Sequence, residues 1–223
     1  MTTIHSDGTR PRPSVFGSLG YLLMNLVVGI LGFVGIVTAW AVGAGTAVVW
    51  VGLPVLALAI LGTRGAARVE RARVYAMLDT YIATPYPPLP VTGRWKARLK
   101  DGATWRDTAY FVLLLPIGVA EFSIMIALWS ASAWLVALPL VYRFLPDGAW
   151  LLWDTDHPRI VVDSFLEALP FAGAGLVLLA LTVPLTRAMG AAHAVFARSV
   201  LGPSQAKIRS LEPWESDGVR VGV

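Results

Sequence analysis

The sequence contains an uncharged stretch, from Val15 to Gly62, that is longer than one membrane crossing needs. About 20 apolar residues are enough to span the hydrocarbon layer of a bilayer. The stretch therefore predicts two membrane-crossing helices, and residues 43–46, which include two glycines, offer the turn between them. We place these helices at about 17–42 and 46–64.

Part of this stretch is repeated later in the chain. Four residues recur 89 positions further on, and each copy then continues to a Leu-Pro pair: Tyr21, Gly29, Phe33, Trp40 and Leu53-Pro54 match Tyr110, Gly118, Phe122, Trp129 and Leu138-Pro139. Only 14% of the residues are charged and 56% are hydrophobic, whereas soluble domains average about a quarter charged. The sequence predicts an all-α integral membrane protein built from a duplicated helical-hairpin unit.

Two further long apolar segments complete the predicted architecture. A third crossing covers about 108–130, and a last one covers 168–186, with its helix continuing to about residue 201. The intervening segment 131–145 is short for a full span and contains a proline and an arginine. We therefore predict about four full transmembrane helices plus one short re-entrant or fifth segment.

Lysine and arginine residues are unevenly distributed between the predicted spans. Nine lie between Thr63 and Asp107, two in the N-terminus and five after the last span, whereas residues 146–167 contain one arginine and five acidic residues. Basic segments remain on the cytoplasmic side of membranes. Charge therefore places both termini on the cytoplasmic side of the cell membrane, and this arrangement requires an even number of crossings. The repeat instead predicts that 131–145 crosses as a fifth span, and we follow the charge pattern.

The same pattern divides the chain into a cytoplasmic N-terminal tail (1–16), a membrane domain (17–202) and a cytoplasmic C-terminal tail (203–223). Within the domain we expect a basic, proline-rich cytoplasmic loop at 65–103 and an external acidic loop at 146–167. Basic and aromatic side chains near the cytoplasmic loop predict contact with anionic lipid headgroups. These are Arg64, Arg68, Arg71, Arg94, Trp95, Lys96, Arg98, Lys100 and Trp105.

An ordered series of short motifs covers about residues 15–204. The series includes Gly52-Leu53-Pro54, Ala67-Arg68-Val69-Glu70-Arg71, Thr104-Trp105-Arg106-Asp107-Thr108-Ala109-Tyr110, Phe165-Leu166-Glu167-Ala168-Leu169 and Val200-Leu201-Gly202-Pro203-Ser204. It resembles the sensor domain at the N-terminus of many actinobacterial membrane histidine kinases. In those kinases a signalling helix and the phospho-acceptor histidine follow the last motif. Because only residues 205–223 follow it here, the resemblance implies an input module without the kinase.

Glu121 is the clearest candidate for a ligand or switch residue, because an ionised carboxylate near the middle of a span is costly. It could change its protonation state or anchor a cationic ligand. Alternatively, it is a neutral carboxyl group that is hydrogen-bonded to another helix, for example at Asn25, Thr38 or Ser123.

In the acidic loop, Asp154, Asp156 and His157 could bind a divalent metal or respond to mild acid, or they could simply form a solvated loop. His193 lies among alanines with no acidic residue after it, so we do not expect it to be a phospho-acceptor. Small residues recur in the first span and favour close helix packing, within the chain or across a homodimer. They are Gly17, Gly20, Gly29, Gly32 and Gly35.

No arrangement typical of a catalytic site is visible, and the chain has no cysteine. We therefore predict no catalytic residue, no metal, no cofactor and no nucleic-acid partner. The leading hypothesis is a non-enzymatic sensor-like module that relays a membrane or extracellular signal to a separate partner, such as a kinase or regulator. The alternatives are a structural or assembly subunit of a membrane complex and, third, a small transporter, since transporters are often built from duplicated units.

Overall fold

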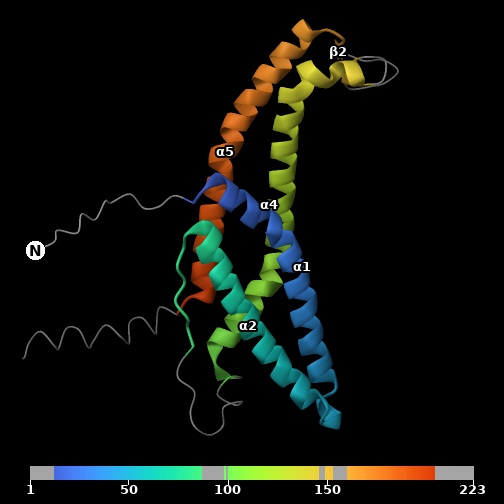
Figure 1. Cartoon of the computed structure of the whole chain (residues 1–223). Coiled ribbons are helices and arrows are strands. Elements are labelled where there is room, and N and C mark those ends of the chain that lie inside the picture. The colour runs from blue at the N-terminus through green and yellow to red at the C-terminus, as the bar shows by residue number, and fades with distance from the viewer. Residues whose placement is uncertain (1–12, 87–97, 99, 146–148, 153–159, 204–223) are drawn as a thin grey trace, which may run out of the picture.

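The structure is a computed structural model that describes residues 13–86, 98, 100–145, 149–152 and 160–203 (Figure 1). Its described part is dominated by four long helices: α1 (Val15–Gly45), α2 (Gly52–Leu78), α4 (Gly102–Val141) and α5 (Phe165–Leu201). All four are long and apolar enough to cross a membrane. The predicted all-α fold with four full spans is therefore confirmed.

The outward-facing side chains of these helices are largely apolar. Leu31 on α1, Leu58 on α2 and Leu181 on α5 are 68%, 68% and 63% exposed. A soluble protein rarely exposes large contiguous apolar surfaces of this kind. The helices therefore present to their surroundings the surface that a bilayer solvates.

Short elements connect the helices at the tips of the two hairpins. The first tip contains the 3₁₀ turn η1 (Ala47–Val49), after which Trp50 adopts a left-handed backbone conformation with φ 63°. The second tip contains the turn η2 (Tyr142–Phe144) and two strands, β1 (Trp150–Leu152) and β2 (Ile160–Val162), which pair antiparallel. These strands were not predicted from the sequence.

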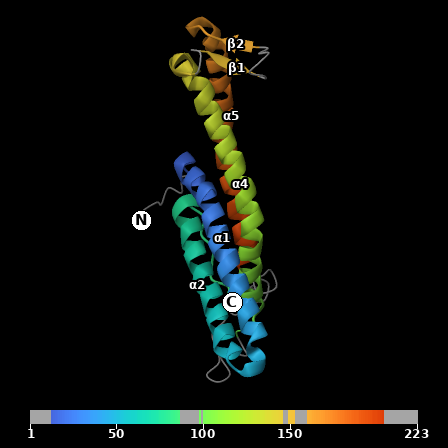
Figure 2. The ribbon, with the colours of Figure 1, turned by 90° about the vertical axis from the view of Figure 1, so that its right-hand side faces the viewer.

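α1 and α4 cross at the centre of the molecule (Figures 1 and 2). There each repeated glycine lies against the backbone of the opposing helix. A Cβ atom on Gly29 would lie 2.9 Å from the carbonyl oxygen of Leu114, and one on Gly118 would lie 2.6 Å from that of Asn25. Leu114 lies 89 positions after Asn25, so the two contacts are equivalent under the repeat. The two copies are therefore related by an approximate twofold axis through this crossing.

The predicted short fifth segment is wrong, because α4 continues unbroken to Val141 and the remainder of 131–145 forms η2 and the residue after it. The sequence contains the reason. The positions 89 residues after Gly43-Ala44-Gly45-Thr46 are Ser132-Ala133-Trp134-Leu135. The second copy thus has no glycine where residues 43–46 end α1, and the helix continues.

The structural counterpart of α2 is α5. Thr63 and Thr186 lie 123 positions apart, and each side chain donates a hydrogen bond of 2.8 Å to the carbonyl group four residues earlier. The two helices end at Leu78 and Leu201, which have the same spacing and are both buried. The duplicated unit is thus α1–α2 and α4–α5, which together make four long helices.

The start of α1, the end of α2 and the last turns of α5 lie together. Pro13, Asp79 and Arg198 line one cavity between these three helix ends. At this end, Gly190 of α5 packs against the Ser18 side chain, where a Cβ atom would lie 2.8 Å from the hydroxyl oxygen. The tips of the two hairpins lie at the remote ends of the molecule (Figure 1).

Candidate functional site

One polar side chain from each long helix meets at a buried junction. Tyr21 of α1 and Tyr110 of α4 both contact the Glu70 carboxylate of α2, with hydroxyl-to-Oε1 distances of 2.6 and 2.9 Å. The Tyr110 hydroxyl also lies 3.1 Å from Nε2 of His193 on α5. These four side chains are at most 3% exposed.

Three further side chains extend this junction along α1, α2 and α4. The Asn25 amide donates to Oε2 of Glu121 at 2.6 Å and accepts from Arg73 at 2.5 Å. Glu121 also pairs with Nδ1 of His193 at 2.7 Å, and Arg73 pairs with Glu70 at 2.9 Å. The amide of Asn25 therefore connects the Glu121–His193 pair with the Glu70–Arg73 pair. We call these seven residues the junction: Tyr21, Asn25, Glu70, Arg73, Tyr110, Glu121 and His193.

The junction can adopt more than one hydrogen-bond arrangement. Tyr110 has a single hydroxyl proton but two neighbouring acceptors, the Glu70 carboxylate and, in one tautomer, His193 Nε2. Rotation of the hydroxyl group would move this one hydrogen bond of α4 between Glu70 of α2 and His193 of α5. Ionisable groups inside a membrane domain are costly and commonly functional, so the junction is the strongest candidate site in the described structure.

A second cluster lies at the end of α5. Arg71 of α2 donates to Asp107 Oδ1 at 2.9 Å and, through Nη2 and Nε, to the carbonyl oxygen of Leu201 at 3.0 and 3.2 Å. Tyr86, in the segment after α2, lies over the Arg71 guanidinium and donates to Asp107 at 2.5 Å. Burial, reinforced by this bond to Asp107, raises the pKa of Tyr86 to about 12. We call Arg71, Tyr86, Asp107 and the Leu201 carbonyl group the exit cluster.

Two of the predicted headgroup residues, Arg64 and Arg71, are buried and form ion pairs with the start of α4. Arg64 and Arg71 are only 6% and 5% exposed. Arg64 pairs with Asp101 at 2.6 Å, just as Arg71 pairs with Asp107. Both acidic partners lie at the start of α4, and a buried guanidinium is stable only when it is paired.

The other predicted headgroup residues are placed differently. Arg68 and Lys100 are exposed, and Trp105 is 51% exposed with its ring 5.0 Å from that of Trp40. Arg98 is partly buried and its carbonyl group accepts from Thr104. Contact of these residues with lipid stays a prediction. Outside the described residues lie Arg94, Trp95, Lys96, Asp154, Asp156 and His157.

The structure brings together two predicted candidates, Glu121 and Asn25, and supports the interpretation that Glu121 is hydrogen-bonded to another helix. Sequence analysis missed the other five junction residues. The spacing of 123 positions could have indicated two of them. Glu70 and His193 have this spacing and are therefore equivalent residues of α2 and α5. Within the described residues no group of three potential metal ligands occurs.

Two equivalent helical hairpins with apolar outer surfaces and a polar junction define a multi-pass membrane protein of duplicated architecture. The sequence model of the family described as "Putative sensor" matches residues 21–201, from the first junction tyrosine to the end of α5. The chain belongs to this family, which supports a sensor-like role and favours a non-catalytic one. No curated protein and no solved structure matches the chain.

Proposed function

We propose that the protein is a non-enzymatic sensor-like module that relays a membrane or extracellular signal to a separate cytoplasmic or membrane partner. Family membership supports the sensor-like part of this proposal. The relay is our inference from how the helices are joined. The junction bonds all four helices to one another, so a change on one helix alters the hydrogen bonds of the others.

The observation that carries the relay is the Arg71 side chain. It connects α2 to Asp107 at the start of α4, to Tyr86 and to the last carbonyl group of α5. Arg71 lies one residue after Glu70 of the junction. A rearrangement at the junction therefore has a direct covalent and hydrogen-bonded path to the end of α5.

We infer that the end of α5, together with the start of α1 and the end of α2, lies on the cytoplasmic side of the cell membrane. An even number of long helices, and a shared cavity between the start of α1, the end of α2 and the last turns of α5, support both termini being on one side. The exposed Arg187 and Arg198 of α5 favour the cytoplasmic side. A relay to a cytoplasmic partner needs this orientation.

Site-specific photo-crosslinking in native membranes tests the proposal. A photoreactive residue in place of Val195, which is 70% exposed beside the α5 exit, should capture a signalling protein such as a kinase or regulator. The matched control is Val177, 62% exposed in the apolar half of the same helix, which should not. The same protein captured from both positions, in a complex that survives purification at fixed stoichiometry, would instead identify a structural subunit. Absence of any adduct at Val195 would contradict the relay.

A transporter is the second candidate, because the two equivalent hairpins enclose a polar network near their symmetry axis. Within the described residues, the junction is closed by direct side-chain hydrogen bonds. Substrate passage would have to break the Glu70–Arg73 and Glu121–His193 pairs. Substrate-dependent uptake into proteoliposomes that contain only this chain would favour the transporter.

A further inference from the structure

A continuous chain of hydrogen bonds connects the two carboxylates of the junction. From Glu121 it passes to Nδ1 of His193 at 2.7 Å. From Nε2 of His193 it passes to the Tyr110 hydroxyl group at 3.1 Å, and from there to Oε1 of Glu70 at 2.9 Å. The His193 side chain has no exposed surface, so both of its ring nitrogens depend on partners within the protein.

The number of protons on the Glu121–His193 pair decides whether this chain of bonds is complete. The contact of 2.7 Å between the Glu121 carboxylate and Nδ1 needs one proton between the two atoms, because two bare acceptors repel each other. If a second proton is bound at Nε2, the ring donates to the oxygen of Tyr110, and the hydroxyl proton of Tyr110 is free to bond to Glu70. Every contact in the chain then joins one donor to one acceptor.

Without the proton on Nε2, Tyr110 loses one of its two contacts. The bare Nε2 atom and the Glu70 carboxylate are then both acceptors, and Tyr110 has a single hydroxyl proton to donate. A hydrogen bond to an ionised acceptor is roughly twice as strong as one to a neutral acceptor. Tyr110 therefore keeps its bond to Glu70 of α2 and gives up its bond to His193 of α5.

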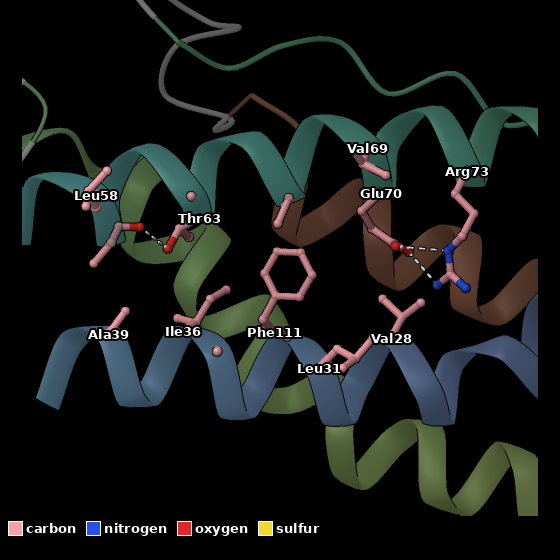
Figure 3. Close-up of a pocket in the computed structure, with 15 residues that line it drawn as sticks. Val28, Leu31, Ile36, Ala39, Leu58, Thr63, Val69, Glu70, Arg73 and Phe111 are labelled. Atoms are coloured by element: carbon pink, nitrogen blue, oxygen red, sulfur yellow. Dashed lines mark hydrogen bonds and ion pairs between the residues drawn. The ribbon is translucent and has the colours of Figure 1, made fainter. Parts of the chain in front are cut away.

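The same proton sets the net charge of the junction. The charge of Glu70 is balanced by Arg73, whose guanidinium group lies 2.9 Å from it (Figure 3). With two protons the Glu121–His193 pair is neutral, whereas with one proton it carries a negative charge that no cation balances, and such a buried charge is costly. Among the described residues, the titratable or charged side chains around the pair are Tyr21 from α1, Glu70 and Arg73 from α2, and Tyr110 from α4.

We propose that the Glu121–His193 pair is a proton-binding site, and that release of the Nε2 proton to bulk water breaks the hydrogen bond between Tyr110 and His193. The proton belongs to the pair rather than to either residue, because the two groups are directly bonded. The inference rests on the proposed function only for its consequence, which is that proton release changes how α5 is held and so provides a signal for the relay. Proton binding itself is measured without a partner, so its failure and the failure of the relay are distinguishable.

The experiment is NMR spectroscopy of the full chain in phosphatidylcholine bilayers, with an NMR-active nitrogen isotope in the histidine rings. The substitutions His5→Gln and His157→Gln leave His193 as the only histidine. Between about pH 5 and about pH 9, an interval that includes the ordinary titration range of histidine, Nε2 should carry a proton at the acid end and lose it at the alkaline end. Nδ1 should keep the proton that bonds to Glu121 at the alkaline end. An unchanged Nε2 across this interval, or loss of the proton from Nδ1 instead, would overturn the proposal.

Two variants supply the second arm. In Glu121→Gln a protonated ring would be a buried cation without its carboxylate partner, so the proton on Nε2 should be absent over the whole interval, and its persistence would contradict the pair.

Tyr110→Phe keeps the aromatic ring that stacks on Phe196 but removes the hydroxyl group. The readout is the distance distribution between spin labels on Val69→Cys of α2 and Val195→Cys of α5, two positions that are each 70% exposed. In the chain with Tyr110 this distribution should broaden as Nε2 loses its proton, with the same midpoint, whereas in Tyr110→Phe it should be the same at both ends of the interval. An equal response in both chains, or no response in the chain with Tyr110, would overturn the assignment of the switch to this hydroxyl group.

Discussion

Replacement of Arg71 by methionine tests whether the exit cluster holds the end of α5. Methionine keeps the apolar length of the side chain but removes every bond that the guanidinium makes to Asp107, Tyr86 and the Leu201 carbonyl group. Asp107 is 1% exposed, so its carboxylate would be left buried without its ion-pair partner. Removal of one partner from such a pair costs about 3–5 kcal/mol.

The free energy of unfolding can be measured by tryptophan fluorescence as SDS is titrated into protein in mixed micelles. Arg68→Met is the matched control, because Arg68 lies one turn earlier on α2 and is exposed. Its effect should stay within about 0.5 kcal/mol. In the double variant Arg71→Met/Asp107→Asn, the loss should be smaller than the sum of the single losses. An Arg71→Met loss below about 1 kcal/mol, typical of a surface pair, would refute the cluster.

Three further substitutions have defined outcomes. Gly118→Leu should lower the free energy of unfolding by about 3 kcal/mol, because a Cβ atom at this position would lie 2.6 Å from a carbonyl oxygen of α1. The control Gly173→Leu has open space around it and should have little effect. Equal losses in the two variants would contradict the close contact of α1 and α4 at Gly118. Glu121→Leu should lower the free energy of unfolding by about 2 kcal/mol more than Glu121→Gln, because glutamine keeps a hydrogen-bond acceptor. Equal melting temperatures of the two variants would contradict a role for Glu121 as a buried hydrogen-bond partner. Tyr86 has its pKa raised from 10.0 to about 12, so its stabilisation is full below pH 10.0 and lost as the pH rises through about 12. Tyr86→Phe should therefore show a smaller fall in melting temperature over that interval, and identical pH profiles would count against the bond to Asp107.

The repeat that relates α1 and α4 could be predicted from the sequence because its residues make equivalent contacts. Gly29 and Gly118 recur since each lets the opposing backbone approach at the α1–α4 crossing. The counterpart of α2 was assigned wrongly. The pair Leu138-Pro139 resembles Leu53-Pro54 at the start of α2 but lies inside α4. α5 and α2 have few identical residues at equivalent positions, because two helices can pack in equivalent ways when only the spacing of their buried residues is the same.

The inward direction of the α2 arginines could not be predicted from α2 itself. The positions of Arg64 and Arg71 on one helical face fit either headgroups or a buried surface. Which of these holds depends on Asp101 and Asp107, far along the chain at the start of α4. The role of His193 could not be predicted from α5 for the same reason, because its partners Glu121 and Tyr110 belong to another helix.

Cysteine accessibility measures most directly whether the exit cluster faces the cytoplasm. The chain contains no cysteine, so the single substitutions Asp163→Cys beside β2, Asp79→Cys after α2 and Arg198→Cys on α5 each introduce one exposed thiol. In intact cells, a membrane-impermeant maleimide should label only the position beside β2, and the other two should react after the membrane is permeabilised. Labelling at position 198 from outside intact cells would contradict the account, because the end of α5 would then have no route to a cytoplasmic partner.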